Sequence, residues 1–302
     1  MDVSTLADLP PEGLRALLPG FLGAQVGDAA AADRAYAVVK GEVATWGDDV
    51  CRSVARRLAE VATQVQVWEA VPDARRLART FIGDLAPGRV EGLQHLIAAA
   101  EAGPVTIVCN HVSYVDTTVT DLLLARMGHD ALADRLVAAA GPKVYTDAFR
   151  RVAAICLHTI PVPQSGSVGH AEHVSARELA AWALRALDVA SEAVGEGRIV
   201  VVYAEGSRTR SGRLGSFLKG VHRWLGLRPG THVVPAGLTG TDRLMPLGRE
   251  RLFPADVGLT FGAPIAVDPV GTREALALAW HGVAALLPAV LAPDADTKPI
   301  VG

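Results

Sequence analysis

The hydrophobic pattern of this chain changes near Gly103, and that change most constrains the fold. Before it, apolar residues recur at every third or fourth position, which is the period of an amphipathic helix. This pattern predicts helices over residues 11–18, 33–46, 49–68, 72–84 and 90–102. After Gly103, short apolar runs alternate with helical segments. Such alternation is typical of α/β folds, so we expect a mixed, largely parallel sheet flanked by helices.

The expected elements suggest two parts of the chain. Strands are expected over residues 105–109, 136–140, 159–162, 199–203, 232–238 and 257–261. The helices among and after them are expected over residues 116–127, 147–154, 175–194, 217–227 and 275–292. The last one reaches membrane-spanning length, but His281 and Gly282 near its middle favour a packed helix. We therefore expect a helical N-terminal segment or small bundle over residues 1–95 and an α/β domain over residues 96–302.

Composition and charge narrow the class of partner. Half of the 302 residues are hydrophobic, as in a compact globular protein. The net charge is only -3, so no strong field favours nucleic acid. Over residues 203–251, however, nine Lys or Arg face three Asp or Glu. This excess predicts either a solvated positive face or a site for a phosphorylated substrate.

Cysteine usage and the N-terminus bear on the compartment. The three cysteines show neither disulfide nor metal-ligand spacing, and residues 1–18 lack a basic start followed by a long apolar stretch. We therefore expect a protein of the reducing cytoplasm. A peripheral position on the inner face of the membrane is the alternative. The expected helix 217–227 has an apolar face that suits either a bilayer or packing on the sheet; the residues are Phe217, Val221, Trp224 and Leu225.

A histidine and an aspartate follow the first expected strand. His111 stands just past its end, and Asp116 comes five positions later at the start of the next helix. A carboxylate on one imidazole nitrogen fixes the tautomer and stabilises the imidazolium, so the other nitrogen can act as a general base. His129 and Asp134 have the same spacing, but no apolar strand precedes them. We therefore predict His111 as the base, with Asp116 able to orient it and to cap the helix.

A second polar cluster, Glu205-Gly206-Ser207-Arg208, follows the expected strand 199–203. Ligand sites of parallel sheets gather at the carboxyl ends of strands, and both clusters fall at such ends. Glu205 can line a pocket there, cap the next helix, or do both. A general base with an arginine and a glycine turn indicates acyl transfer to a hydroxyl. The substrate's own hydroxyl would attack a thioester directly, because a thiol of pKa about 8.5 departs readily.

Three blocks of the chain resemble, in order and spacing, motifs I, III and IV of the glycerolipid acyltransferases. This family includes the glycerol-3-phosphate and 1-acylglycerol-3-phosphate acyltransferases. The blocks are Asn110-His111-x4-Asp116, residues 203–212 with Lys219-Gly220 behind them, and residues 233–237. The resemblance covers roughly residues 103–261, and the helical N-terminal segment is similar to that of the soluble plant and bacterial-type glycerol-3-phosphate acyltransferases.

The resemblance implies roles for particular residues. His111 would be the base and Asp116 its partner, while the substrate-binding residues would be Asn110, Lys143, Glu205, Gly206, Ser207 and Arg208. Arg208 would bind the acceptor's phosphate, because a planar guanidinium grips phosphate oxygens bidentately. Lys143, where the second motif lies, would add a phosphate contact. The family also implies acyl-CoA or acyl carrier protein as co-substrate, a phosphorylated glycerol acceptor, no metal and no further cofactor.

The chain departs from the family pattern at several places. Motif III usually opens with Phe-Pro and has threonine after the glycine, whereas this chain has Tyr203-Ala204 and Ser207. Near the end of the second motif, many members have an arginine where this chain offers only His158. These changes leave open an acceptor other than a glycerol phosphate.

Other reactive side chains have plainer interpretations. Cys109 closes an apolar run two residues before His111, a position typical of the core rather than of a nucleophile. His170 and His173 flank Glu172, but no third convergent ligand accompanies them, so we expect solvated loop residues rather than a metal site.

The sequence therefore predicts an O-acyltransferase that moves a fatty acyl group to the hydroxyl of a glycerol phosphate or lysophosphatidic acid type acceptor. Two alternatives stay open. The first is an acyltransferase of the same fold that acts on a non-glycerolipid alcohol or amine. The second is a non-catalytic lipid or acyl-carrier binding module, which would have little need of the base.

Overall fold

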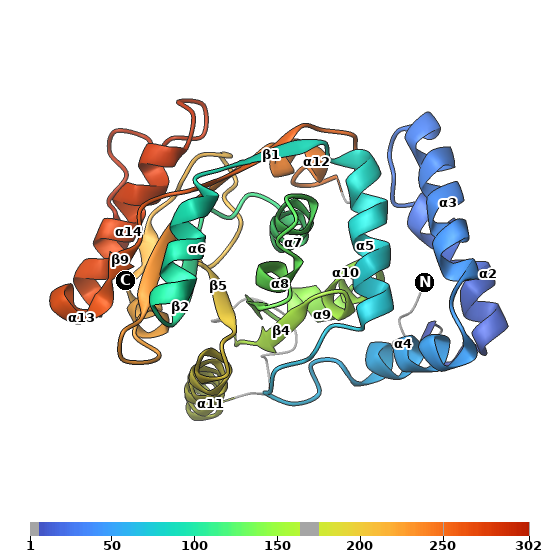
Figure 1. Ribbon diagram of the computed structural model, residues 1–302, viewed down its shortest axis with the longest axis horizontal. Coiled ribbons are helices and arrows are strands. Elements are labelled where there is room, and N and C mark those ends of the chain that lie inside the picture. The colour runs from blue at the N-terminus through green and yellow to red at the C-terminus, as the bar shows by residue number, and fades with distance from the viewer. Residues whose placement is uncertain (1–5, 164–174, 250, 302) are drawn as a thin grey trace.

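The computed structural model describes residues 6–163, 175–249 and 251–301. Its first part is helical and is drawn in blue to teal in Figure 1: α2 (Pro11–Gly23), α3 (Ala29–Ala44), α4 (Asp48–Glu60) and α5 (Pro72–Leu85). In α4, Cys51, Val54 and Leu58 share the buried face while Arg52 is exposed, as the helical period requires. Helices are thus confirmed here, but the one expected over residues 49–68 ends at Glu60.

A mixed, mostly parallel sheet forms the second part, in the order β1-β8-β7-β2-β5-β3-β4, with β9 beside β7. Only the pairs β7·β8 and β7·β9 are antiparallel. The strands are β1 (Gly88–Glu91), β2 (Val105–Cys109), β3 (Leu136–Ala140), β4 (His158–Pro161), β5 (Ile199–Tyr203), β7 (His232–Thr239), β8 (Val257–Phe261) and β9 (Ile265–Ala266). The expected fold class is therefore confirmed, and four strands have the predicted bounds.

Helices cover both faces of the sheet because successive side chains of its inner strands point to opposite sides. In β2, Ile107 packs in the core shared with the N-terminal helices, and Val108 packs in a second cluster beneath α14 (Thr272–Leu286). In β5, Val201 and Val202 divide in the same way, and Val202 faces the cluster of α11 (Ala176–Gly195). The other helices are α6 (Leu93–Ala102), α7 (Asp116–Arg126), α8 (Asp130–Ala133), α9 (Lys143–Thr146), α10 (Ala148–Ile155), α12 (Thr241–Leu244) and α13 (Val267–Val270).

The helix predicted over residues 90–102 begins later, because β1 occupies residues 88–91 and pairs in parallel with β8. Two glycines allow this pairing. A Cβ on Gly88 would lie 2.6 Å from the carbonyl oxygen of Val257. Gly92 has a φ of +67°, and a Cβ there would lie 2.1 Å from the carbonyl oxygen of Phe261. The sheet thus starts within the residues for which only helices were predicted.

The helix predicted over residues 217–227 is wrong. Residues Phe217–Leu218 form the short strand β6, which pairs with β10 (Ile300–Val301), and Lys219–Trp224 form a single 3-10 segment, η1. The Leu218 N–H also donates to the carbonyl of Ala204. These bonds to distant parts of the chain replace the ones that a helix would have made within itself.

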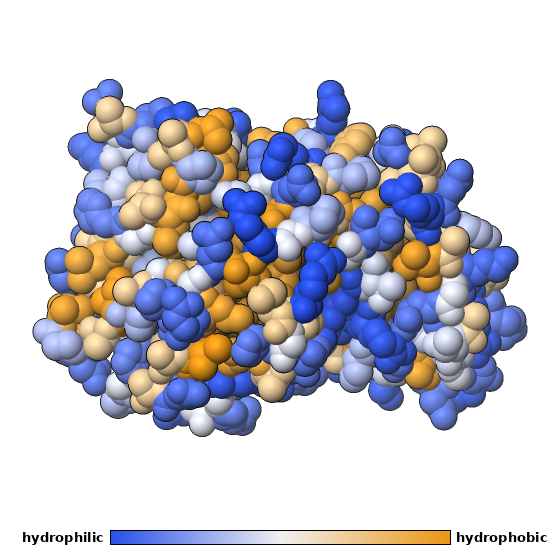
Figure 2. Space-filling model, turned by 45° about the horizontal axis from the view of Figure 1, so that its top comes forward, coloured by the Kyte–Doolittle hydropathy of each residue, from blue (hydrophilic) through white to orange (hydrophobic). Residues whose placement is uncertain are grey.

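The surface is not uniformly polar. Figure 2 shows one face on which apolar side chains gather in a central area bordered by hydrophilic ones. Large apolar residues with substantial exposure include Leu218 at 42% and Leu247 at 45%. Across residues 6–163, 175–249 and 251–301, no helix has the length and apolar character needed to cross a membrane.

Candidate active site

The two polar clusters meet because their strands are neighbours. β2 and β5 pair in parallel, with Cys109 opposite Tyr203, so each cluster leaves the same edge of the sheet two residues beyond that pair. The backbone N–H of His111 donates to Glu205 Oε2 at 2.6 Å. The Thr209 N–H donates to the His111 carbonyl at 2.9 Å. The structure thus brings together segments that lie far apart in the sequence.

His111 and Asp116 form a close pair. His111 Nδ1 lies 2.8 Å from Asp116 Oδ2, and the same oxygen accepts the backbone N–H groups of Val112 at 2.9 Å and Ser113 at 3.0 Å. Asp116 is 1% exposed and opens helix α7, so it both orients the imidazole and caps the loop. His111 Nε2 has no hydrogen-bond partner within the described residues. A histidine held by one nitrogen with the other open has the arrangement of a general base.

Tyr203, which departs from the family pattern at the opening of motif III, contacts the candidate base directly. Its ring stacks on that of His111, with centroids 4.4 Å apart and planes at 26°. Its hydroxyl shares a hydrogen bond with Thr117 Oγ1 at 2.8 Å, and burial raises its pKa well above the usual value for tyrosine. The phenol therefore stays neutral and fixes the plane of the imidazole. Its place at the end of a strand, two residues before Glu205, was the available signal.

Glu205 braces two loops. One carboxylate oxygen accepts the His111 N–H, and the other accepts the Gly215 N–H at 2.7 Å. Burial raises the pKa of Glu205, while these two donors oppose that rise. Gly206 follows with a φ of +72°, and a Cβ on it would lie 2.3 Å from Leu218 Cδ1. The turn after β5 therefore needs a glycine, and the glutamate ties it to the histidine loop.

Asn110 lies beneath the site rather than in it. The side chain is 1% exposed, its Nδ2 donates to the Leu238 carbonyl at 3.0 Å, and its Oδ1 accepts the Leu238 N–H at 2.8 Å. Both polar atoms thus join the end of β2 to β7. This geometry gives the amide a bracing contact with the neighbouring strand instead of the substrate contact that the family resemblance implies.

A cavity of about 660 Å³ opens beside His111. Cationic side chains line one part of it: Lys143, Arg150, Arg208, Arg210 and Arg223. Gly206 and Ser207 also line it. Another part is apolar and includes Ala138, Phe149, Leu157, Leu187, Val202 and Trp224. One cavity thus combines a candidate base, positive charge and an apolar wall, which suits a substrate with an anionic head and a fatty chain.

Several other candidates lie away from this cavity. His158 sits at the amino end of β4 and bonds to Arg75, so it does not replace the arginine of the family's second motif in the cavity lining. Cys109 is buried, and burial raises the pKa of its thiol well above the usual value, as expected for a core residue. His170, Glu172 and His173 lie outside the described residues. Among the residues that the structure does describe, no three His, Cys, Asp or Glu side chains gather as a metal site would require.

A family model matches the part of the chain that holds the two polar clusters. The family model described as "Acyltransferase" matches residues 89–239, which is half of the chain. The chain belongs to the glycerolipid acyltransferase family. The matched region runs from β1 to the end of β7 and contains both polar clusters.

Two curated relatives are chloroplastic 1-acyl-sn-glycerol-3-phosphate acyltransferases. BAT2 of Brassica napus is 39% identical over 75 residues, which are 24% of this chain and 22% of the relative. LPAT1 of Arabidopsis thaliana is 42% identical over 62 residues, 20% of this chain and 17% of the relative. The alignments thus span about a fifth of each relative's length. The solved lysophosphatidic acid acyltransferase PlsC of Thermotoga maritima aligns at a TM-score of 0.48 and 17% identity over 90% of this chain and 97% of its own.

Proposed function

We propose that this family member is an O-acyltransferase that moves a fatty acyl group from acyl-CoA or acyl carrier protein to the hydroxyl of a glycerol phosphate or lysophosphatidic acid type acceptor. The single observation that carries the proposal is the His111–Asp116 pair, whose ring borders a cavity with a cationic part and an apolar part. The printed names of the two plant relatives support an acceptor of this class.

The reaction needs no covalent enzyme intermediate. His111 Nε2 accepts the proton of the acceptor hydroxyl while its oxygen attacks the thioester carbonyl, and Asp116 stabilises the resulting imidazolium. The tetrahedral intermediate then expels the thiolate, which takes the proton back from the imidazolium. The ester, the free thiol and neutral His111 remain, so no cofactor beyond the acyl donor enters the balance.

The cationic part of the cavity suits the phosphate of the acceptor. Arg208 and Lys143 both line the cavity beside His111, and neither has an ion-pair partner within the residues described. Unpaired cations in a cleft favour an anionic ligand, and a guanidinium contacts phosphate through two parallel hydrogen bonds. We infer that they bind the acceptor's phosphate, while the apolar wall holds the acyl chain.

A single assay tests the proposal: transfer from radiolabelled acyl-CoA or acyl carrier protein to glycerol 3-phosphate, lysophosphatidic acid and their unphosphorylated counterparts. His111→Ala should lower kcat by at least about 10³-fold, since general-base catalysis and orientation are both lost. His129→Ala is the matched control, because it removes the histidine of the same spacing that lies elsewhere, and it should leave the rate unchanged.

The same assay separates the alternatives. The wild type should prefer phosphorylated acceptors, and Arg208→Ala should abolish that preference. An equal rate with unphosphorylated alcohols or amines would favour the other acceptor class. If His111→Ala transferred acyl groups at the wild-type rate, His111 would not be the general base. If the wild type turned over no thioester, a binding module would be favoured.

A further inference from the structure

Two guanidinium groups contact one aromatic ring beside the candidate base. Arg208 Cζ lies 3.5 Å from the centroid of the Tyr114 ring, and Arg150 Cζ lies 4.6 Å from the same centroid. Tyr114 belongs to the His111 loop, Arg208 to the loop after β5, and Arg150 to helix α10. All three line the cavity. Three separate segments thus converge on one ring.

The two arginines are close enough to share one phosphate group. Both distances start from one centroid, so the two Cζ atoms are about 8 Å apart at most. Charge-assisted hydrogen bonds to phosphate are about 2.7–2.9 Å long and extend outward from each guanidinium. Because the Tyr114 ring lies against both groups, a phosphate shared by them would lie beyond the edge of the ring, in the cavity that all three residues line.

The charges around Tyr114 do not cancel. Arg150 Nε lies 3.4 Å from Asp147, which also accepts the Arg150 backbone N–H at 3.0 Å as the N-cap of α10. Arg208 has no carboxylate partner in the described ranges, and Lys143 lines the same cavity. Asp147 thus offsets the charge of Arg150, while Arg208 and Lys143 are not offset by an ion pair among the described residues. The aromatic face stabilises each guanidinium and offsets part of their mutual repulsion.

We propose that Arg150 is a second guanidinium ligand of the bound phosphate and that Tyr114 is a positioning residue that holds Arg150 and Arg208 toward it. The assignment of this phosphate to the acceptor depends on the proposed function. Arg150 would also supply, from α10, a cation that the chain does not offer at His158, where many relatives have an arginine.

The donor is the other source of a phosphate, because coenzyme A carries phosphate groups of its own. The first arm of the test therefore measures binding of glycerol 3-phosphate to the whole chain by calorimetry, with no acyl donor present. The second arm measures KM separately for the acceptor and for the acyl donor. An unphosphorylated alcohol serves as a third substrate whose rate should not depend on Arg150.

Arg150→Gln removes the charge and keeps most of the side-chain length. We expect it to raise the Kd for glycerol 3-phosphate and the KM for the phosphorylated acceptor about 10-fold or more, with the donor KM unchanged. Arg150→Lys should recover part of the loss, since it restores charge but not the planar fork. Arg52→Gln, a surface variant with the same charge change, should behave as the wild type.

The positioning role of Tyr114 is tested by an effect on the acceptor KM, which a general folding defect would not produce selectively. Tyr114→Phe keeps the ring and should stay within about 3-fold of the wild type in KM, whereas Tyr114→Leu should raise the acceptor KM about 3- to 10-fold at nearly unchanged kcat. A thermal melt of each variant shows that the fold is intact. Loss of kcat with an unchanged acceptor KM in Tyr114→Leu would overturn the positioning role.

The outcomes separate this proposal from the proposed function. A donor KM that rises alone in Arg150→Gln would assign the phosphate to the donor and overturn the proposal, and so would a variant with no change in either arm. A wild-type chain that binds glycerol 3-phosphate through Arg150 but never transfers an acyl group would overturn the proposed function and leave the anion site standing.

Discussion

Two histidines of this chain each pair with a carboxylate, and their surroundings give them opposite character. His111 pairs with Asp116 at the carboxyl edge of the sheet, and its second nitrogen stays open beside the cavity. His158 pairs with Glu69 at the amino end of β4, and its Nε2 meets Arg75 Nη1 at 3.0 Å. One ring has a free nitrogen next to a ligand space, while the other has both nitrogens engaged.

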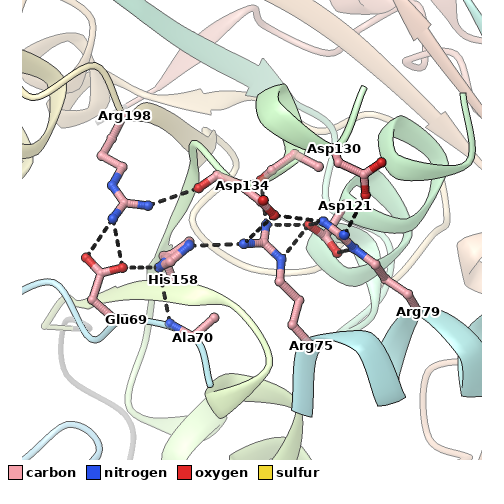
Figure 3. Close-up of polar contacts among 10 residues, drawn as sticks. Glu69, Ala70, Arg75, Arg79, Asp121, Asp130, Asp134, His158 and Arg198 are labelled. Carbon is pink, nitrogen blue, oxygen red and sulfur yellow. Dashed lines mark hydrogen bonds and ion pairs between the residues drawn. The ribbon is translucent and has the colours of Figure 1, made fainter. Parts of the chain in front are cut away.

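His158 belongs to a partly buried ionic network, shown in Figure 3. The network runs from Arg198 through Glu69, His158 and Arg75 to Asp121. The pKa of His158 is lowered to about 4. Burial is the largest cause; Glu69 opposes it, and the Arg198 and Arg75 cations add to it. The ring is therefore neutral near pH 7, and its Nε2 accepts from Arg75.

The network also supports the site indirectly. Asp121 is 1% exposed and accepts from Arg75 Nε at 2.9 Å and from Arg79 Nε at 2.8 Å. Both arginines belong to α5, and Asp121 belongs to α7, the helix that begins at Asp116. The buried charges thus fix the helix that carries the partner of the base. A histidine with a carboxylate is a base only where its second nitrogen is open, and elsewhere the same pair links structural elements.

The comparison predicts the largest effect when the partly buried network is broken. Asp121→Ala leaves Arg75 and Arg79 without the buried carboxylate that they share, and only the exposed Asp134 still contacts both, so the free energy of unfolding should fall by about 3–5 kcal/mol. Urea unfolding measures it. Asp49→Ala is the control, because it breaks a surface pair with Arg52 and should cost less than about 1 kcal/mol. Equal losses in the two variants would show that the buried pair has no special weight.

On the proposed function, changes to the His111–Asp116 pair should lower the reaction rate more than the stability. Asp116→Asn keeps an oxygen for the backbone N–H groups of Val112 and Ser113 but removes the charge that stabilises the imidazolium. We expect kcat to fall about 10²- to 10³-fold, or about 3–4 kcal/mol in the activation barrier. Steady-state assays measure it, and Asp49→Asn, which changes an exposed carboxylate of α4, should keep the wild-type kcat. A full rate in Asp116→Asn would mean that His111 needs no anionic partner.

The smallest effect concerns pH. His158 has a pKa of about 4 in the folded chain and about 6.5 when unfolded, so between these values the unfolded chain binds more protons. Stability should therefore fall as the pH drops from about 6.5 to 4, by up to about 3 kcal/mol from this group. Urea unfolding at a series of pH values, with His158→Gln as the reference, isolates the contribution. Parallel pH curves for the two proteins would contradict it.

Local order along the chain was predictable, because it depends on residues close in sequence. The apolar runs gave β2, β3, β5 and β8 with their observed bounds, and the five-residue spacing together with the preceding strand was enough to pair His111 with Asp116. Two predictions were wrong for one reason: a helix was expected over residues 217–227, and strand β1 was not expected. Both segments take their form from hydrogen bonds to distant chain, with β10 and β8 respectively.

The sequence by itself determined the strand-and-helix class, the candidate base His111 and the carboxylate of Asp116 that orients it, because periodicity and short-range order along the chain encode them. Only the tertiary structure decided that Glu205 holds the His111 backbone, that Arg150 approaches Arg208 across Tyr114, and that His158 lies in a partly buried network instead of the cavity. Such contacts join residues dozens of positions apart. They exist because the order of strands places particular chain ends side by side, and no local pattern records that order.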